Sequence, residues 1–243
     1  NTYFSKYQAL DELGFYKDSA RVRAIFLKAL DEPFWKLREI AIDNLEKHKG
    51  EDTTAILLRI SLTAQNEKNT TVRALAITTI AEKLRPKFEL IYKKGLKDSS
   101  YAVVGASLLA YLKLKPVDAD STLKIFDTEI NPEIVSAIAE YYSSNYDSTK
   151  YEWFANKIRV IKPESLFFII QDFGTYLIKS NAKLQEKGAE ILLPLAEKSQ
   201  FDWVRYSAYK SLIMVGLKSK EQELRRIKEN EKSERLKRLY KNL

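Results

Sequence analysis

The chain has 243 residues, of which 45% are apolar and 30% are charged, and its net charge is +8. This composition is typical of an ordinary folded protein, and no apolar run approaches the roughly 18 residues that a membrane helix needs, so we expect no membrane span. The chain has no cysteine, which excludes disulfides and thiolate chemistry but leaves its localisation unknown.

Most of the net charge lies at the C-terminal end of the chain. Residues 218–243 contain ten Lys or Arg and five Asp or Glu, a net charge of +5, which leaves +3 of the total +8 for all the preceding residues. A solvated basic terminal helix explains this distribution better than a phosphate-binding surface does. The charge therefore gives little support to a nucleic-acid partner.

The first clear helix signal follows Asp31, which can cap a helix that begins Glu32-Pro33-Phe34-Trp35. Proline is tolerated in a first turn because its missing amide has no partner there. Apolar residues then recur with the period of one helix face, at Leu37, Ile40, Ala41 and Leu45. Gly50 is the expected stop, in a left-handed cap.

Similar start and stop signals recur along the rest of the chain. Asn131-Pro132-Glu133 repeats the capped start, and Gly95 and Gly216 each follow a helical stretch. Three glycines inside helical patterns indicate close helix packing, namely Gly105, Gly174 and Gly188. No segment keeps a period of two, so the sequence predicts helices and no strands.

One local pattern recurs along these helices: an apolar residue followed by Arg, then Ala three positions on and a large aliphatic residue after another four. The copies are Leu37-Arg38 with Ala41 and Leu45, Val72-Arg73 with Ala76 and Ile80, and Val204-Arg205 with Ala208 and Leu212. The arginines lie 35 and 132 positions apart, and weaker copies fall between the last two. A helical-hairpin repeat of roughly 31 to 35 residues explains this spacing.

These observations predict an all-α fold. We expect an α-solenoid of antiparallel helical hairpins, of the HEAT or armadillo type, with about fourteen helices. The whole chain, 1–243, is predicted to be a single helical-repeat domain. Its last segment, 219–243, is predicted to be a basic C-terminal capping helix, because a solenoid must cover its last apolar face.

The repeated arginines Arg38, Arg73 and Arg205 are predicted to be structural. A guanidinium one turn into a helix can reach loop carbonyls or an acidic side chain of a neighbouring repeat, and can hold hairpins in register. The candidate acidic partners stand at the heads of repeat helices, at Asp31, Asp98 and Asp202. A role in binding a ligand is the alternative for these arginines.

The sequence offers no recognisable catalytic, cofactor-binding or metal-binding residues. Its only histidine, His48, lies among charges near a predicted helix end, which excludes any site built from two histidines. The seven glycines are scattered, so no glycine-rich phosphate loop is present. The tryptophans could stack on a ligand, but as members of helical patterns they are better explained as core or hairpin contacts, at Trp35, Trp153 and Trp203.

Two stretches resemble a known family. Residues 31–41, DEPFWKLREIA, and residues 98–108, DSSYAVVGASL, are similar to the HEAT-like C-terminal region of bacterial zinc aminopeptidases of the aminopeptidase N type. The resemblance implies that this chain is a non-catalytic domain cut from a larger enzyme, which packs on the catalytic domain of the same polypeptide and encloses or gates its active-site chamber. Zinc is then expected in the catalytic domain of the parent protein, and a peptide substrate would be contacted at most indirectly. No zinc ligand or Gly-x-Met-x-Asn loop of the family has a counterpart here, so no catalytic residue is transferred.

Two other functions stay open at this stage. One is an independent scaffold for protein–protein interaction, with a surface built from successive helices. The other, which the sequence favours least, is a helical-repeat protein that binds nucleic acid. The chain itself is not assigned as an enzyme.

Overall fold

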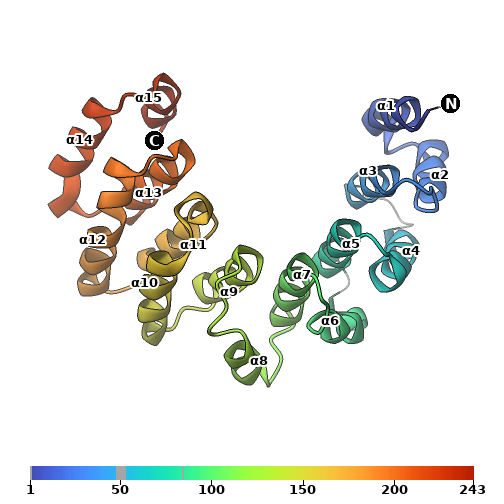
Figure 1. Cartoon of the computed structure of the whole chain (residues 1–243), viewed down its shortest axis with the longest axis horizontal. Coiled ribbons are helices and arrows are strands. Elements are labelled where there is room, and N and C mark those ends of the chain that lie inside the picture. Colours follow the sequence, from blue (N-terminus) through green and yellow to red (C-terminus); the bar gives the residue numbers. More distant parts are fainter. Residues whose placement is uncertain (1, 48–52, 84) are drawn as a thin grey trace. The chain divides into compact units, whose positions relative to one another are not determined.

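A computed structural model of the chain describes residues 2–47, 53–83 and 85–243, so His48 and the predicted stop at Gly50 lie outside the described residues. The described residues form 15 α-helices and no strand, which confirms the predicted all-α helical-repeat fold (Figure 1). The chain divides into two compact units, 1–124 and 125–243. Within the described ranges no helix has both the length and the apolar character needed to cross a bilayer.

The first unit is built from two layers of helices. Its helices are α1 (Tyr3–Leu13), α2 (Ala20–Ala29), α3 (Trp35–Glu46), α4 (Thr53–Asn66), α5 (Thr70–Lys83), α6 (Glu89–Gly95), α7 (Tyr101–Leu112) and α8 (Ala119–Ile125). Helices α1, α3, α5 and α7 pack in succession in one layer, and α2, α4 and α6 form the second layer beside them (Figure 1). Each hairpin therefore places one helix in each layer, as a solenoid repeat requires.

The second unit repeats this arrangement. Its helices are α9 (Pro132–Ser144), α10 (Tyr151–Val160), α11 (Phe167–Ile178), α12 (Ala182–Lys198), α13 (Asp202–Val215), α14 (Glu221–Asn230) and α15 (Glu234–Lys241). Helices α9, α11, α13 and α15 pack in succession, and α10, α12 and α14 form the second layer. The strongest packing joins α11 to α13 and α12 to α13.

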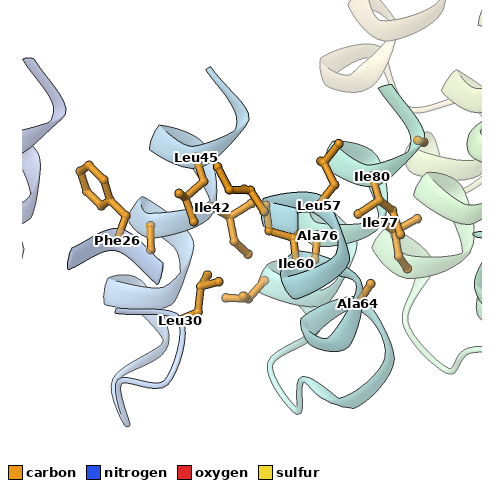
Figure 2. Close-up of a cluster of buried hydrophobic side chains, with 14 of the residues drawn as sticks. Phe26, Leu30, Ile42, Leu45, Leu57, Ile60, Ala64, Ala76, Ile77 and Ile80 are labelled. Atoms are coloured by element: carbon orange, nitrogen blue, oxygen red, sulfur yellow. The ribbon is translucent and has the colours of Figure 1, made fainter. Parts of the chain in front are cut away.

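The core of the first unit lies between its two layers. Figure 2 shows Phe26 of α2, Ile42 of α3 and Ile60 of α4 among the apolar side chains that meet there. All three are completely or almost completely buried. Each such side chain contributes roughly 1.5–3 kcal/mol when it leaves water, so the apolar face of each helix fixes its hairpin to the next one.

Two predicted helix boundaries are corrected by the structure. Helix α3 begins at Trp35, and its N-cap residue is Phe34. Asp31, three residues before Phe34, therefore does not cap this helix. Helix α6 ends at Gly95, but among the described glycines only Gly216 has a left-handed φ, of 70°. Gly95 instead makes room for Ser107 of α7, because a Cβ at Gly95 would lie 2.0 Å from its Oγ. The capped start at Asn131 is confirmed, since its side chain accepts from the Glu133 amide.

The predicted single capping helix over 219–243 is also corrected. The segment forms two helices, α14 and α15, separated by residues 231–233. The chain leaves the helix at Glu231, whose carboxylate accepts the backbone amides of Lys232 and Ser233, and Ser233 then caps α15. Tyr240 of α15 stacks on Tyr209 of α13 with ring centroids 4.1 Å apart. The basic end of the chain is therefore a last hairpin.

Close packing of α11 on α13 depends on Gly174. A Cβ at this position would lie 2.5 Å from the Oγ, 2.6 Å from the Cβ and 3.2 Å from the Cα of Ser211. We expect Gly174→Ala to lower the free energy of unfolding of the second unit by about 2 kcal/mol, because the two helices must move apart. Urea unfolding followed by circular dichroism measures this change.

A second substitution controls the Gly174 prediction. The variant Gly174→Ala/Ser211→Gly removes the two closest atoms, so it should recover most of the lost stability. At Gly188 the three atoms nearest to the added methyl group all belong to the side chain of Leu177 and none to the backbone, so Gly188→Ala should have a smaller effect than Gly174→Ala. Equal stability of the wild-type and Gly174→Ala proteins would contradict the packing that we describe.

Candidate functional site

The three repeated arginines all reach back to the connector that precedes their own helix. In each case Nη1 donates to the backbone carbonyl six residues earlier. The pairs are Arg38 with Glu32 at 2.7 Å, Arg73 with Glu67, and Arg205 with Ser199 at 2.7 Å. The helix places the arginine one turn after its start, and from there the long side chain covers the entry of its own hairpin.

Each arginine also binds a carboxylate from the connector of the next hairpin, 25 to 29 residues further on. Arg38 binds Glu67 through two hydrogen bonds of 2.6 and 2.7 Å. The corresponding bonds join Arg73 to Asp98 at 2.9–3.1 Å and Arg205 to Glu231 at 3.0 and 3.1 Å. We call each such set, an arginine with its carbonyl and its carboxylate, a clamp. A clamp fixes one hairpin against the next with the planar geometry that favours an Arg–carboxylate pair.

Two of the three predicted acidic partners bind a repeated arginine, and the third does not. Asp98 binds Arg73, and Asp202 binds Arg205 at 2.7 Å within the same helix. Asp31 does not bind Arg38 but pairs with Arg59 of α4, and its side chain is mostly exposed. Arg38 binds Glu67 instead, and Arg205 binds Glu231 in addition to Asp202. Neither glutamate was predicted from the sequence.

A local signal could have identified the missed carboxylates. Each clamp acid stands two residues before the Asn or Ser that directly precedes a helix, in Glu67-Lys68-Asn69, Asp98-Ser99-Ser100 and Glu231-Lys232-Ser233. In all three the carboxylate accepts the backbone amide two residues later, at 2.8 to 2.9 Å. This turn aims the carboxylate away from its own helix and towards the preceding arginine.

The clamp carboxylates are ionised in spite of their burial. Burial acts to raise the pKa of Glu67 and Glu231, but hydrogen bonds from the arginines and from backbone amides outweigh it, so each pKa lies below its ordinary value. Asp98 behaves in the same way, with its pKa lowered by the Ser100 amide and by Arg73. The clamps are therefore charged pairs over the neutral pH range.

In the first unit the clamps are linked to one another. The side chain of Glu67 accepts from Arg38, while its backbone carbonyl accepts from Arg73. Because Arg73 also binds Asp98 of the following connector, the two clamps together link three consecutive hairpins. A similar pair precedes them, since Lys6 of α1 donates to both carboxylate oxygens of Glu32 at 2.9 Å and the carbonyl of Glu32 accepts from Arg38.

Comparison with known proteins adds no family to this description. Neither any family model nor any curated protein matches the chain. In the part of the chain that the structure describes, no group of three or more acidic or histidine side chains is placed to hold a metal ion.

A groove opens beside each clamp, between neighbouring helices of the second layer. The groove beside Arg73 lies between α4 and α6 and has a volume of about 630 Å³. Smaller grooves of about 210 Å³ and 270 Å³ lie between α2 and α4, and between α12 and α14.

The three tryptophans make contacts within the fold. Trp153 packs edge-on against Tyr142 with centroids 5.1 Å apart, and Trp35 lies beside Phe34 at 6.2 Å. Trp203 is 47% exposed, but its indole N–H donates to the carbonyl of Glu164 in the preceding hairpin at 3.0 Å. Each ring thus contributes to packing within or between hairpins.

One further titratable group lies apart from the clamps. Asp172 of α11 accepts a hydrogen bond of 2.9 Å from Ser143 of α9. Burial is the main cause that raises the pKa of Asp172 from 3.8 to about 6; the Ser143 bond opposes this change, and the nearby Glu140 adds to it. The carboxylate therefore binds a proton more tightly in the folded chain than in the unfolded one.

The raised pKa of Asp172 predicts a stability that falls as pH rises from about 4 to about 6. In this range the native state binds more protons than the unfolded state, so the free energy of unfolding decreases with pH. Raising a pKa from 3.8 to about 6 corresponds to at most about 3 kcal/mol. We expect Asp172→Asn to remove this dependence and to be more stable than the wild type at pH 7.

Urea unfolding of both proteins across pH 4 to 7 tests this expectation. Glu190→Gln, which neutralises an exposed carboxylate of α12 in the same unit, is the control and should leave the pH dependence in place. If the wild type and Asp172→Asn had parallel pH profiles, Asp172 would not be the group responsible.

Proposed function

We propose that this chain is a non-catalytic helical-repeat scaffold that acts by binding another protein. The observation that supports this most is the use of the repeated arginines, each of which is held by a carboxylate and a backbone carbonyl of the fold. Their side chains are only 14 to 17% exposed. The most distinctive residues of the sequence therefore stabilise the stack, and the surfaces between hairpins are left for a partner.

The resemblance noted in the sequence gives a more specific form of this proposal. In that form the partner is the catalytic domain of a zinc aminopeptidase on the same polypeptide, and the scaffold encloses or gates the active-site chamber. Zinc then belongs to the catalytic domain, and a peptide substrate meets this chain at most indirectly. In the alternative form the chain is an independent interaction scaffold.

The non-catalytic character is tested on the purified chain. We expect no stoichiometric zinc by elemental analysis and no release of amino acids from peptides or amino-acid p-nitroanilides. Zinc bound one-to-one, or aminopeptidase turnover that survives repurification, would contradict the proposal.

A second experiment separates the two forms. The aminopeptidase form predicts a His-Glu-x-x-His motif several hundred residues upstream in the same reading frame. It also predicts that deletion of residues 1–243 from that enzyme changes the relative hydrolysis of long and short peptides. A reading frame without the motif would contradict this form and favour the independent scaffold.

A further inference from the structure

The groove beside Arg73 has a distinct chemical character. Its apolar lining includes Ile77 of α5, Ile91 of α6 and Val103 of α7. Its rim carries three lysines at the end of α6 and in the connector after it, namely Lys93, Lys94 and Lys97. Ile77 and Val103 are almost completely buried, so the apolar lining residue that a partner can reach beside these lysines is the partly exposed Ile91.

The charges of this groove are not balanced. Its lining contains four cations, the three lysines and Arg73, against two carboxylates. Both carboxylates, Glu67 and Asp98, are already bound by clamp arginines. Lys93 pairs with Glu89 at 2.6 Å, whereas Lys94 and Lys97 are exposed and form no ion pair with any described residue. Two cations are therefore free to bind an anionic partner.

The groove beside Arg73 adjoins a second groove. It shares Asn66 and Glu67 with the groove between α2 and α4, so the two lie on either side of the end of α4. A partner that crosses α4 there would meet cations on the α6 side and the pair formed by Asp31 and Arg59 on the α2 side.

We infer that this groove binds an extended acidic segment of a protein partner. The inference rests on the proposed scaffold function and names the chemistry of its partner. Carboxylates of the segment bind Lys94 and Lys97, and an apolar side chain between them packs on Ile91. A nucleic acid fits less well, because a phosphate backbone carries no apolar side chain that would cover Ile91.

Fluorescence anisotropy on the full chain tests this inference. The probe is a labelled twelve-residue peptide of repeated Glu-Glu-Leu, and the matched probe replaces every Glu by Gln. We expect the acidic peptide to bind more tightly, with an affinity that falls as salt is added. The variant Lys94→Glu/Lys97→Glu should weaken binding by about tenfold, since two ion pairs are replaced by repulsions.

A matched variant controls for net charge. Lys87→Glu/Lys124→Glu makes the same change in charge at exposed lysines of the first unit that lie outside the groove, so it should alter the affinity by less than about twofold. Circular dichroism melts establish that both variants fold. Equal weakening by the two variants, or equal affinity for the Glu and Gln peptides, would overturn the inference.

Titration with phosphate-bearing ligands is a further test of the acidic-peptide assignment. Single-stranded oligonucleotides and a phosphorylated peptide are titrated under the same conditions. If either bound more tightly than the acidic peptide and lost affinity in Lys94→Glu/Lys97→Glu, the groove would be a phosphate site and the acidic-peptide assignment would be wrong. These results are independent of the zinc and turnover tests, which alone decide whether the chain is catalytic.

Discussion

Replacement of Arg205 by methionine is expected to lower the free energy of unfolding of the second unit by about 3 kcal/mol. Methionine keeps much of the apolar stem but removes the cation that binds Glu231 and Asp202. The side chain of Glu231 is only 5% exposed, so its charge would be left in a poorly hydrated place with only backbone amides as partners. Urea unfolding followed by circular dichroism measures the loss, and hydrogen exchange in α13 and α15 locates it.

The surface pair between Arg226 and Glu197 provides the matched control. Nη2 of Arg226 lies 2.9 Å from Oε1 of Glu197, about as close as Arg205 lies to Glu231, but the two side chains are 58% and 38% exposed. Arg226→Met should therefore change the stability by less than about 1 kcal/mol. If Arg205→Met and Arg226→Met lowered the free energy of unfolding equally, the clamp would be no stronger than a surface ion pair.

The destabilisation by Arg205→Met should also depend on pH. In the native chain the pKa of Glu231 lies below its ordinary value of 4.5. A lowered pKa contributes stability that is present above pH 4.5 and is lost as pH falls through the native-state value. The difference between wild type and variant should thus narrow in acid.

Leu37→Ala is expected to destabilise the first unit by about 3 kcal/mol. Leu37 is completely buried in the core between the two layers, and its truncation leaves a cavity that the neighbouring helices cannot fill without moving. Urea unfolding measures the change. An unchanged midpoint would show that the inner face of α3 is assigned wrongly.

Leu90 of α6 is the matched leucine for this prediction. It is 82% exposed in the same unit, so Leu90→Ala removes the same atoms without creating a cavity. Its effect should be within about 0.5 kcal/mol. The contrast between the two leucines separates core packing from the general cost of losing apolar groups.

The helices were predictable because their signals are local. The apolar period around Leu37 and the cap at Asn131 each depend on residues within one or two turns. The same reasoning placed one helix over 219–243, because apolar periodicity alone does not show the break that the local pattern Glu231-Lys232-Ser233 marks. The break exists because Glu231 must leave the helix to reach Arg205, 26 residues away, and a long-range contact of this kind is not encoded in periodicity.

The clamps were predictable only in part. The repeated arginines indicated a bond to the next hairpin, but which acid accepts it depends on how the connectors turn. Asp31 stands at the head of a predicted helix, yet the chain turns so that Glu32 and Glu67 flank Arg38 and Asp31 lies against Arg59. The grooves were not predictable at all, because they arise from the spacing between helices of the second layer.

The most direct test of the clamp is a double-mutant cycle on Arg205 and Glu231. The free energy of unfolding is measured for the wild type, Arg205→Met, Glu231→Gln and the double variant. We predict a coupling energy of roughly 2 kcal/mol, with the double variant far less destabilised than the sum of the two single changes. A coupling energy indistinguishable from zero would contradict the claim that the repeated arginines hold successive hairpins in register.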